Sequence, residues 1–123
     1  MRSGSSDSYI PKQGDIIWTN FTPQAGREQA GRRPALVLSP IRYNRRIGLA
    51  LVCPITSRVK GYPGEVMIPE GLVVSGVVLA DQVKSIDWQA RGAEFACQMP
   101  LEVVAEVVTV LTNLLPPPPL PIR

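Results

Sequence analysis

The sequence contains no histidine among its 123 residues. Imidazole is the usual general base near neutral pH, the partner of Ser or Cys nucleophiles, and a common zinc ligand. Catalysis by a Ser–His or Cys–His pair and binding of metal by histidine are therefore excluded. Any catalytic group must come from an Arg, Lys, Asp, Glu, Ser, Thr or Tyr side chain.

Cysteine and long apolar runs are also scarce. The two cysteines, Cys53 and Cys97, are too far apart in sequence to form a metal-binding pair, and we expect both to be reduced. No apolar run approaches the ~20 residues that span a bilayer, and Met1–Ser8 lacks the apolar core of a signal peptide. No phosphate-binding GxxxxGK[ST] loop or metal-spaced carboxylate cluster occurs. We therefore expect a cytoplasmic protein with no membrane segment, cofactor or metal.

Positive charge is concentrated in the first half of the chain. The formal net charge is only +3, but many of the cations lie between positions 27 and 60: Arg27, Arg32, Arg33, Arg42, Arg45, Arg46, Arg58 and Lys60. Between positions 100 and 115 the only charges are Glu102 and Glu106. This asymmetry indicates a basic working face for an anionic partner and a terminal packing element.

Short β-type segments separated by turn residues fill most of the chain. We expect strands at 16–21, 35–39, 49–53, 65–69, 76–81 and 93–98, a long loop at 22–33 and a helical turn within 40–46. Pro54 is expected to end the third strand. A helix should follow Pro100, with its packing face formed by Leu101, Val104, Val108, Leu111 and Leu115. This pattern predicts one mainly β domain at 9–115, a small closed barrel with a C-terminal helix. Residues 1–8 should form a loose or vector-derived tail, and 116–123 a Pro-rich extended one.

One loop combines a carboxylate with two guanidinium groups, in the segment Glu28-Gln29-Ala30-Gly31-Arg32-Arg33-Pro34. Pro34 holds Arg33 extended, as the last loop residue, so its guanidinium could clamp a phosphate through two parallel hydrogen bonds. The alternative is a turn with a solvated ion pair. Thr56 and Ser57 follow the adjacent strand and should lie near Arg33. Alternatively, the Thr56 and Ser57 hydroxyls only cap a turn. Asp81 is either a site carboxylate or a cap at the end of a strand.

These residues resemble the MazF/PemK (Kid) family of toxin endoribonucleases over residues 9–115. The resemblance is carried by several collinear blocks: Gly14–Trp18, Glu28–Pro40, Tyr43-Asn44, Pro54–Ser57, Lys60–Pro63 and Leu79–Trp88. The family's catalytic arginine falls on Arg33 and its catalytic threonine on Thr56, and Glu28 matches a motif carboxylate. Some relatives have an arginine where this chain has Leu79. The Kid branch has a histidine that is missing here, so the chain is more similar to the MazF branch.

The resemblance implies a sequence-specific, metal-independent endoribonuclease that cleaves single-stranded messenger RNA and leaves 2′,3′-cyclic phosphate and 5′-hydroxyl ends. It also implies an SH3-like barrel, a homodimer with RNA along its groove, and a MazE-type antitoxin whose acidic tail occupies that groove. Because arginine keeps its proton, we expect Arg33 to stabilise the phosphate rather than act as a base. Thr56 would donate to a phosphate oxygen, and Glu28 is the available base.

RNA recognition is expected to use side chains that stack on bases, bond to their edges or contact phosphates. The candidates are Tyr43, Asn44, Ser57, Arg58, Lys60, Asp81, Gln82 and Lys84. Trp88 could also read a base, although core or dimer packing is the favoured explanation for it. Two other functions fit a basic barrel: a nucleic-acid-binding module that does not cut, and a toxin of related fold directed at gyrase.

Overall fold

The computed structural model describes residues 8–21 and 31–121. Its elements in chain order are β1 (Asp15–Phe21), β2 (Gly31–Val37), α2 (Ile41–Ile47), β3 (Ala50–Thr56), β4 (Glu65–Met67), β5 (Val77–Leu79), the 3₁₀ helix η1 (Ala80–Gln82), β6 (Lys84–Ile86), β7 (Glu94–Gln98) and α3 (Leu101–Asn113). None of the helices within these residues is long and apolar enough to cross a membrane.

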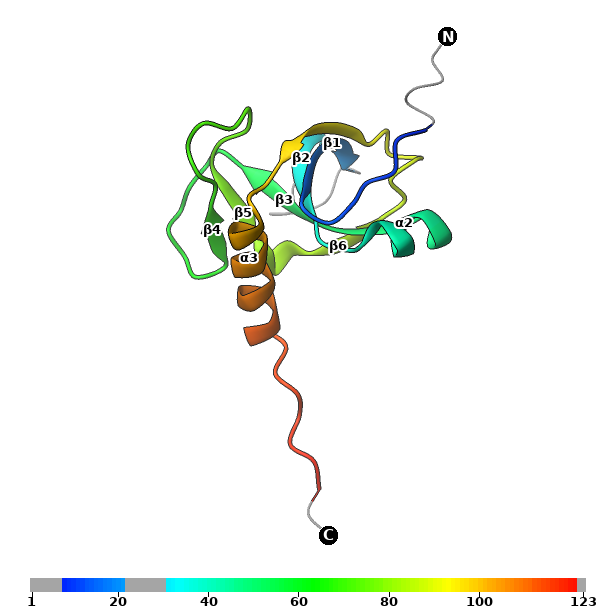
Figure 1. The fold of residues 1–123 in the computed structure, drawn as a ribbon. Helices are drawn as coiled ribbons and strands as arrows, with labels where there is room; N and C mark the ends of the chain where they lie inside the picture. Colours follow the sequence, from blue (N-terminus) through cyan, green and yellow to red (C-terminus); the bar gives the residue numbers. More distant parts are fainter. Residues whose placement is uncertain (1–7, 22–30, 122–123) are drawn as a thin grey trace.

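The strands form an antiparallel sheet in the order β4-β5-β3-β2-β1-β7, with β6 paired to β3 beside this path. Figure 1 shows β4 and β5 at one side of the molecule, α2 at the other, and α3 leading into the extended C-terminal segment. The predicted mainly β fold with a C-terminal helix is confirmed. The sheet is not closed, however: within the described strands no pairing joins β4 to β7. Instead, α3 packs against β4 and η1 and contributes Val104 and Val107 to the core.

The central strands β1, β2 and β3 each bury side chains on both faces of the sheet. Successive side chains along a strand point to opposite faces, and here each face contacts its own apolar cluster. Ile16 and Leu36 belong to the cluster that α3 covers, whereas Ile17, Ala35 and Val52 belong to the cluster next to β6. Double-sided burial explains why these segments read as continuous apolar runs rather than alternating ones.

Pro34 and Pro54 lie inside strands, although each was expected from the sequence to mark a strand end. β2 begins at Gly31 rather than after Pro34, so Arg33 is a strand residue opposite Thr19 and not the last loop residue. Pro34 is tolerated because the β2–β3 pairing begins only at Ala35. Pro54 does not end β3: it lies where β3 changes partners, after β6 pairing ends at Val52 and before β5 pairing begins at Ile55.

Two elements were missed or underestimated. β6 is only three residues long and was not recognised in the mixed-polarity segment after η1, because Ile86 is its single buried residue. α2 is a full helix over Ile41–Ile47 rather than a helical turn, and Gly48 ends it at φ +81°. Gly48 can adopt this left-handed conformation because it has no Cβ atom.

The packing face of α3 includes the predicted Val104 but differs from the prediction at both ends and at Val107. Leu101 is 75% exposed and Leu115 68% exposed, whereas Val107, which the helical spacing did not select, is fully buried. Val108 and Leu111 are partly buried against the same cluster. Leu101 is the first residue of α3 and Leu115 lies two residues past its end, so apolar character there does not produce burial.

We predict that Val107→Ala lowers the free energy of unfolding by about 2 kcal/mol, because it removes buried methyl groups and leaves a cavity. Leu101→Ala is the matched control and should change stability by less than about 0.5 kcal/mol, since that side chain is exposed. Urea denaturation of the three proteins measures both effects. Equal losses at the two positions would show that the buried face of α3 is assigned incorrectly.

Candidate active site

Arg33 and Thr56 line one cavity of about 280 Å³ together with Ser57 and Arg58. The cavity therefore brings together two guanidinium groups and two hydroxyl groups. Arg33 comes from β2, Thr56 is the last residue of β3, and the other two residues follow β3 directly. The predicted meeting of Arg33 with Thr56 and Ser57 is confirmed.

Strand register explains why these residues meet. β2 and β3 are antiparallel, with Ala35 opposite Pro54. Continuing this register by two residues sets Arg33 opposite Thr56, and the two-residue period of a strand keeps their side chains on the same face. The neighbouring Arg32 points the other way. Its guanidinium forms an ion pair with Glu94 and donates to the carbonyl oxygen of Gly92 at 3.0 Å.

The backbone around Thr56 is held from two sides. The Arg58 backbone N–H donates to Thr56 Oγ1 at 3.1 Å, an arrangement that leaves the hydroxyl proton available for a ligand. Gly76 lies against the carbonyl of Thr56 so closely that a Cβ atom added there would be 2.0 Å from that oxygen. Only a glycine permits this approach. It also has φ +113°, in the region that other residues rarely adopt.

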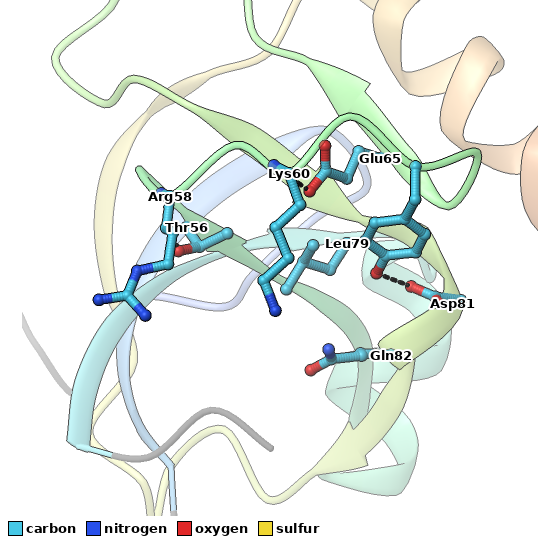
Figure 2. A pocket seen from close by; sticks show the side chains of 8 residues that line it. Thr56, Arg58, Lys60, Glu65, Leu79, Asp81 and Gln82 are labelled. Atoms are coloured by element: carbon cyan, nitrogen blue, oxygen red, sulfur yellow. Dashed lines mark hydrogen bonds between the residues drawn. The ribbon is translucent and has the colours of Figure 1, made fainter. Parts of the chain in front are cut away.

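A second cavity of about 440 Å³ shares Thr56 and Arg58 with the first, so the two are adjacent. Its other lining residues are Lys60, Tyr62, Glu65, Leu79, Asp81 and Gln82. Figure 2 shows the Lys60 side chain and the Gln82 amide extending into the same space from different segments. The sequence-predicted residues Arg58, Lys60, Asp81 and Gln82 therefore lie together beside the Arg33–Thr56 cavity.

Acidic groups shape the segment between β3 and β4 by internal hydrogen bonds. The Glu65 carboxylate accepts from the backbone N–H groups of Lys60 and Gly61 at 3.0 and 2.8 Å. The Tyr62 hydroxyl donates to Asp81 Oδ1 at 2.9 Å, the bond drawn in Figure 2. Desolvation, followed by this hydrogen bond, raises the pKa of Tyr62 to about 12, so the phenol stays protonated at neutral pH. These bonds fix the loop that carries Lys60.

Three predicted RNA contacts lie elsewhere. Asn44 is fully buried, so its proposed base-reading role is wrong for this structure. Its amide accepts from Ser39 Oγ at 2.6 Å and donates to the carbonyl of Pro11 at 2.8 Å. Tyr43 is 39% exposed on α2, which lies away from β4 and β5 in Figure 1. The Lys84 ammonium lies 5.2 Å from the centre of the Phe21 ring, outside both cavity linings.

Other predicted groups are outside the described residues or serve the fold. Glu28 and most of the predicted 22–33 loop fall in the segment 22–30, which the structure does not describe. The Trp88 indole N–H donates to the Asn44 carbonyl at 3.1 Å, and its ring packs on the cluster next to β6. Cys53 is buried, and desolvation with the nearby Asp81 charge raises its pKa to about 12, so it is not a ready nucleophile.

Tyr62, Glu65 and Gly76 were not singled out from the sequence, and Leu79 was noted only as the position where some relatives have an arginine. The Tyr62 ring and Leu79 line the second cavity, and the Glu65 carboxylate caps the loop that carries Lys60. Gly76 lies against the Thr56 carbonyl. Glu65 lies five and four residues after the amides that it accepts from, a spacing that could have suggested a capped loop. For Gly76 no local signal exists, because its role depends on a contact with β3 across the sheet.

The chemistry available here suits a phosphodiester. Arg33, Arg58 and Lys60 supply positive charge, and the Thr56 and Ser57 hydroxyls can donate to phosphate oxygens. Within the described residues no group of three or more His, Cys, Asp or Glu side chains is arranged to hold a metal ion. Stabilisation of developing negative charge by guanidinium and hydroxyl groups is what this constellation offers.

Residues 12–115 match the family described as PemK-like, MazF-like toxin of type II toxin-antitoxin system. The chain belongs to this toxin family. The MazF-like chain is 56% identical to the endoribonuclease toxin MazF of Escherichia coli K12 over 85 residues, covering 69% of this chain and 76% of that protein. It is 34% identical to E. coli endoribonuclease PemK over 109 residues, covering 85% and 81%.

A solved MazF structure from Deinococcus radiodurans supports the same assignment. It superposes on the MazF-like chain with a TM-score of 0.84 at 57% identity, covering 88% of this chain and 98% of that one. A MazE–MazF structure from the same organism matches with a TM-score of 0.80 at 57% identity, covering 88% and 97%. The predicted family and fold are confirmed.

Proposed function

We propose that this chain, an endoribonuclease toxin of a type II toxin–antitoxin system, cleaves single-stranded RNA at a phosphodiester held between Arg33 and Thr56. The shared cavity of these two residues is the observation that carries the proposal. The relatives named endoribonucleases support the reaction class. Cleavage of messenger RNA would stop translation and growth.

In the proposed reaction, the RNA supplies its own nucleophile. The 2′-oxygen attacks the adjacent phosphorus, the bond from phosphorus to the 5′-oxygen breaks, and the products carry 2′,3′-cyclic phosphate and 5′-hydroxyl ends. Arg33 and the Thr56 hydroxyl stabilise the negative charge that develops on the non-bridging oxygens, a role that needs no metal. Arg33 stays protonated throughout, because the guanidinium does not titrate in proteins.

Two proton transfers complete the reaction. The 2′-hydroxyl proton passes to a base, and the leaving 5′-oxygen takes a proton, for which solvent suffices. Glu28 stays the sequence prediction for the base, although it lies outside the described residues. Arg58, Lys60 and Ser57 would contact flanking phosphates or bases, while Asp81 and Gln82 line the space beside the cut.

The partners are proposed from the family and from the surface. Deinococcus radiodurans MazF has been solved with MazE, which supports a MazE-type antitoxin for this toxin, and we propose that both act in the cytoplasm. A homodimer with RNA along its groove is proposed from the family. Candidates for the contact between the two copies are the large apolar side chains that one chain leaves exposed: Trp18, Ile47, Leu51, Met67, Val73 and Phe95. Light scattering on the purified protein would test the dimer.

Thr56→Val tests the proposed catalysis, because it removes the hydroxyl and keeps the β-branched shape. We expect cleavage of a mixed single-stranded RNA in EDTA to fall by about a hundredfold, the usual cost of losing one charge-stabilising donor. Thr56→Ser should restore most of the activity. Mass spectrometry of the wild-type products should find cyclic phosphate ends. Activity of Thr56→Val close to wild type would remove Thr56 from the mechanism.

The same incubation separates the other candidate functions. A nucleic-acid-binding module would retard the RNA in a gel and leave it whole. A gyrase-directed toxin would leave RNA whole and cause DNA damage in cells that express it. Primer extension on a long RNA would then map which bases flank each cut.

A further inference from the structure

Residues 116–121, which follow α3, form an extended segment that the rest of the chain does not hold. They are Pro116–Pro119, Leu120 and Pro121, and each of them is exposed. Figure 1 shows the segment leading away from the domain beyond α3. Within the described residues, none of the six makes a hydrogen bond or an ion pair, and the Leu120 side chain is 84% exposed. The segment also lies beyond residues 12–115, which match the toxin family, so the proposed ribonuclease function does not account for it.

Consecutive prolines give this segment a defined shape without internal hydrogen bonds. Each ring fixes the φ of its proline and restricts the residue before it, so the segment favours a polyproline II helix. That helix has three residues per turn, which places Pro118 and Pro121 on one edge and Pro117 and Leu120 on the next. Two neighbouring edges are therefore apolar, and the backbone carbonyl oxygens remain available as acceptors. Helices of this kind bind to grooves lined by aromatic rings, and they lose little entropy because their shape exists before binding.

A groove with the complementary chemistry lies on the same protein. It is a cavity of about 330 Å³ whose lining includes two aromatic residues, Tyr9 and Trp88, and the exposed amide side chain of Gln89. The Tyr9 hydroxyl donates to Asp15 Oδ2 at 2.6 Å, and the Trp88 indole N–H donates to the Asn44 carbonyl. Because the polar atoms of both rings are already bonded within the domain, the rings offer a ligand apolar surface. Gln89 can donate to a carbonyl oxygen beside them.

This Tyr9–Trp88 groove is separate from the candidate active site, and its charges cancel. None of its lining residues lines either of the cavities at Thr56. Its two charged residues, Arg32 and Glu94, form an ion pair with each other. An anionic ligand such as RNA would therefore gain little here, whereas an uncharged apolar helix can bind without breaking the pair.

The segment and the groove lie on opposite faces of the sheet. α3, from which the segment extends, contributes Val104 and Val107 to one apolar cluster. Tyr9 and Trp88 pack against the other cluster, next to β6. Six residues of polyproline II helix span about 19 Å and act as a stiff spacer. A stiff segment that leads away from the domain does not fold back around the sheet, so the groove that it can enter is that of another molecule (Figure 1).

We infer that residues 116–121 of one copy dock as a polyproline II helix in the Tyr9–Trp88 groove of a second copy. The prolines and Leu120 pack on the two aromatic rings, and Gln89 donates to a backbone carbonyl of the segment. The contact joins two different surfaces of the chain, so it adds further copies unless two molecules exchange segments and close. It is independent of the proposed ribonuclease function, because neither surface includes Arg33 or Thr56.

A labelled peptide of residues 114–123 tests this contact by fluorescence anisotropy. The protein in the assay is the full chain with Leu120→Asp, whose own segment should no longer compete for the groove. We expect the peptide to bind saturably, and a peptide carrying Leu120→Asp to bind at least about tenfold more weakly, because a carboxylate would have to enter an apolar groove. In sedimentation, the unmodified full chain should associate with rising concentration to a degree that the Leu120→Asp chain does not reach.

Substitutions in the groove test the other side of the contact. Trp88→Ala should weaken peptide binding about tenfold. Since Trp88 also packs within the domain, Gln89→Glu provides a second variant at an exposed position, where it replaces an N–H₂ donor with an acceptor. It should weaken binding about threefold or more. Tyr43→Ala removes an exposed aromatic side chain outside the groove and should leave binding unchanged. Circular dichroism checks that each variant is folded.

Three results would overturn the inference. One is the absence of saturable binding up to about 1 mM peptide, which would leave the segment as a ligand for a different protein. Another is equal binding of the unmodified and the Leu120→Asp peptides. The third is binding that neither Trp88→Ala nor Gln89→Glu weakens, because the peptide would then lie outside the groove.

Discussion

Arg33→Ala is expected to lower the rate of RNA cleavage by about a thousandfold while the protein stays folded. The guanidinium is exposed at the cavity and would form parallel hydrogen bonds to the phosphate as it gains charge. Alanine removes both the charge and the donors. Arg33→Lys keeps a cation but not the planar fork, so it should recover only part of the lost rate. Single-turnover cleavage of a labelled RNA measures all three proteins.

Arg32→Ala is the matched control, because it removes the same group from the adjacent residue of the same strand. Arg32 faces Asn20, Gly92 and Glu94 and lines neither of the two adjacent cavities. Exposed ion pairs contribute little to stability, so this variant should cut RNA within a few-fold of wild type. Comparable losses in the two variants would mean that general positive charge matters here, and that Arg33 has no special role in the reaction.

The site residues that could be predicted from the sequence are those set by local order. Arg33 and Thr56 were predicted to meet because they lie on two neighbouring antiparallel strands, whose register sets them opposite each other. The prediction held although the start of β2 and the end of β3 were misplaced. The misplacement had a common cause. A proline in a segment usually marks a strand end, but Pro34 and Pro54 occupy positions where their strands lack a partner on one side. A short stretch of sequence does not show which other strands will pair with it.

The residues that could not be predicted depend on contacts between distant segments. Asn44 looks like a polar residue on an exposed turn, yet it joins α2 to Pro11 and Ser39 from a fully buried position. Val107 falls on the buried side of α3 only because of how the helix lies against the sheet. The Tyr62–Asp81 pair joins two loops 19 positions apart. Helical or strand periodicity carries no information on any of these contacts.

Gly76→Ala is expected to reduce cleavage by about a hundredfold or more, although Gly76 lines neither part of the site. Its added Cβ would lie 2.0 Å from the Thr56 carbonyl oxygen and 2.8 Å from Ser57 Cα, whereas real Cβ contacts stay beyond about 3.0 Å. The end of β3 must therefore move by about 1 Å. A displacement of this size at a catalytic group costs about a hundredfold in rate, because the reacting atoms lose their alignment.

Gly71→Ala separates this displacement from the cost of the backbone conformation. Gly71 also has a positive φ, +99°, but no atom lies within 4 Å of the added Cβ. Both variants should lose about 1–2 kcal/mol of stability from the left-handed conformation, and only Gly76→Ala should lose activity beyond that. Cleavage is measured at a temperature where circular dichroism shows both proteins folded. If kcat falls equally in the two variants, the close approach of Gly76 to Thr56 does not position the catalytic hydroxyl. If only Gly76→Ala loses kcat, the backbone just before β5 positions Thr56 for the reaction, although Gly76 lines neither cavity.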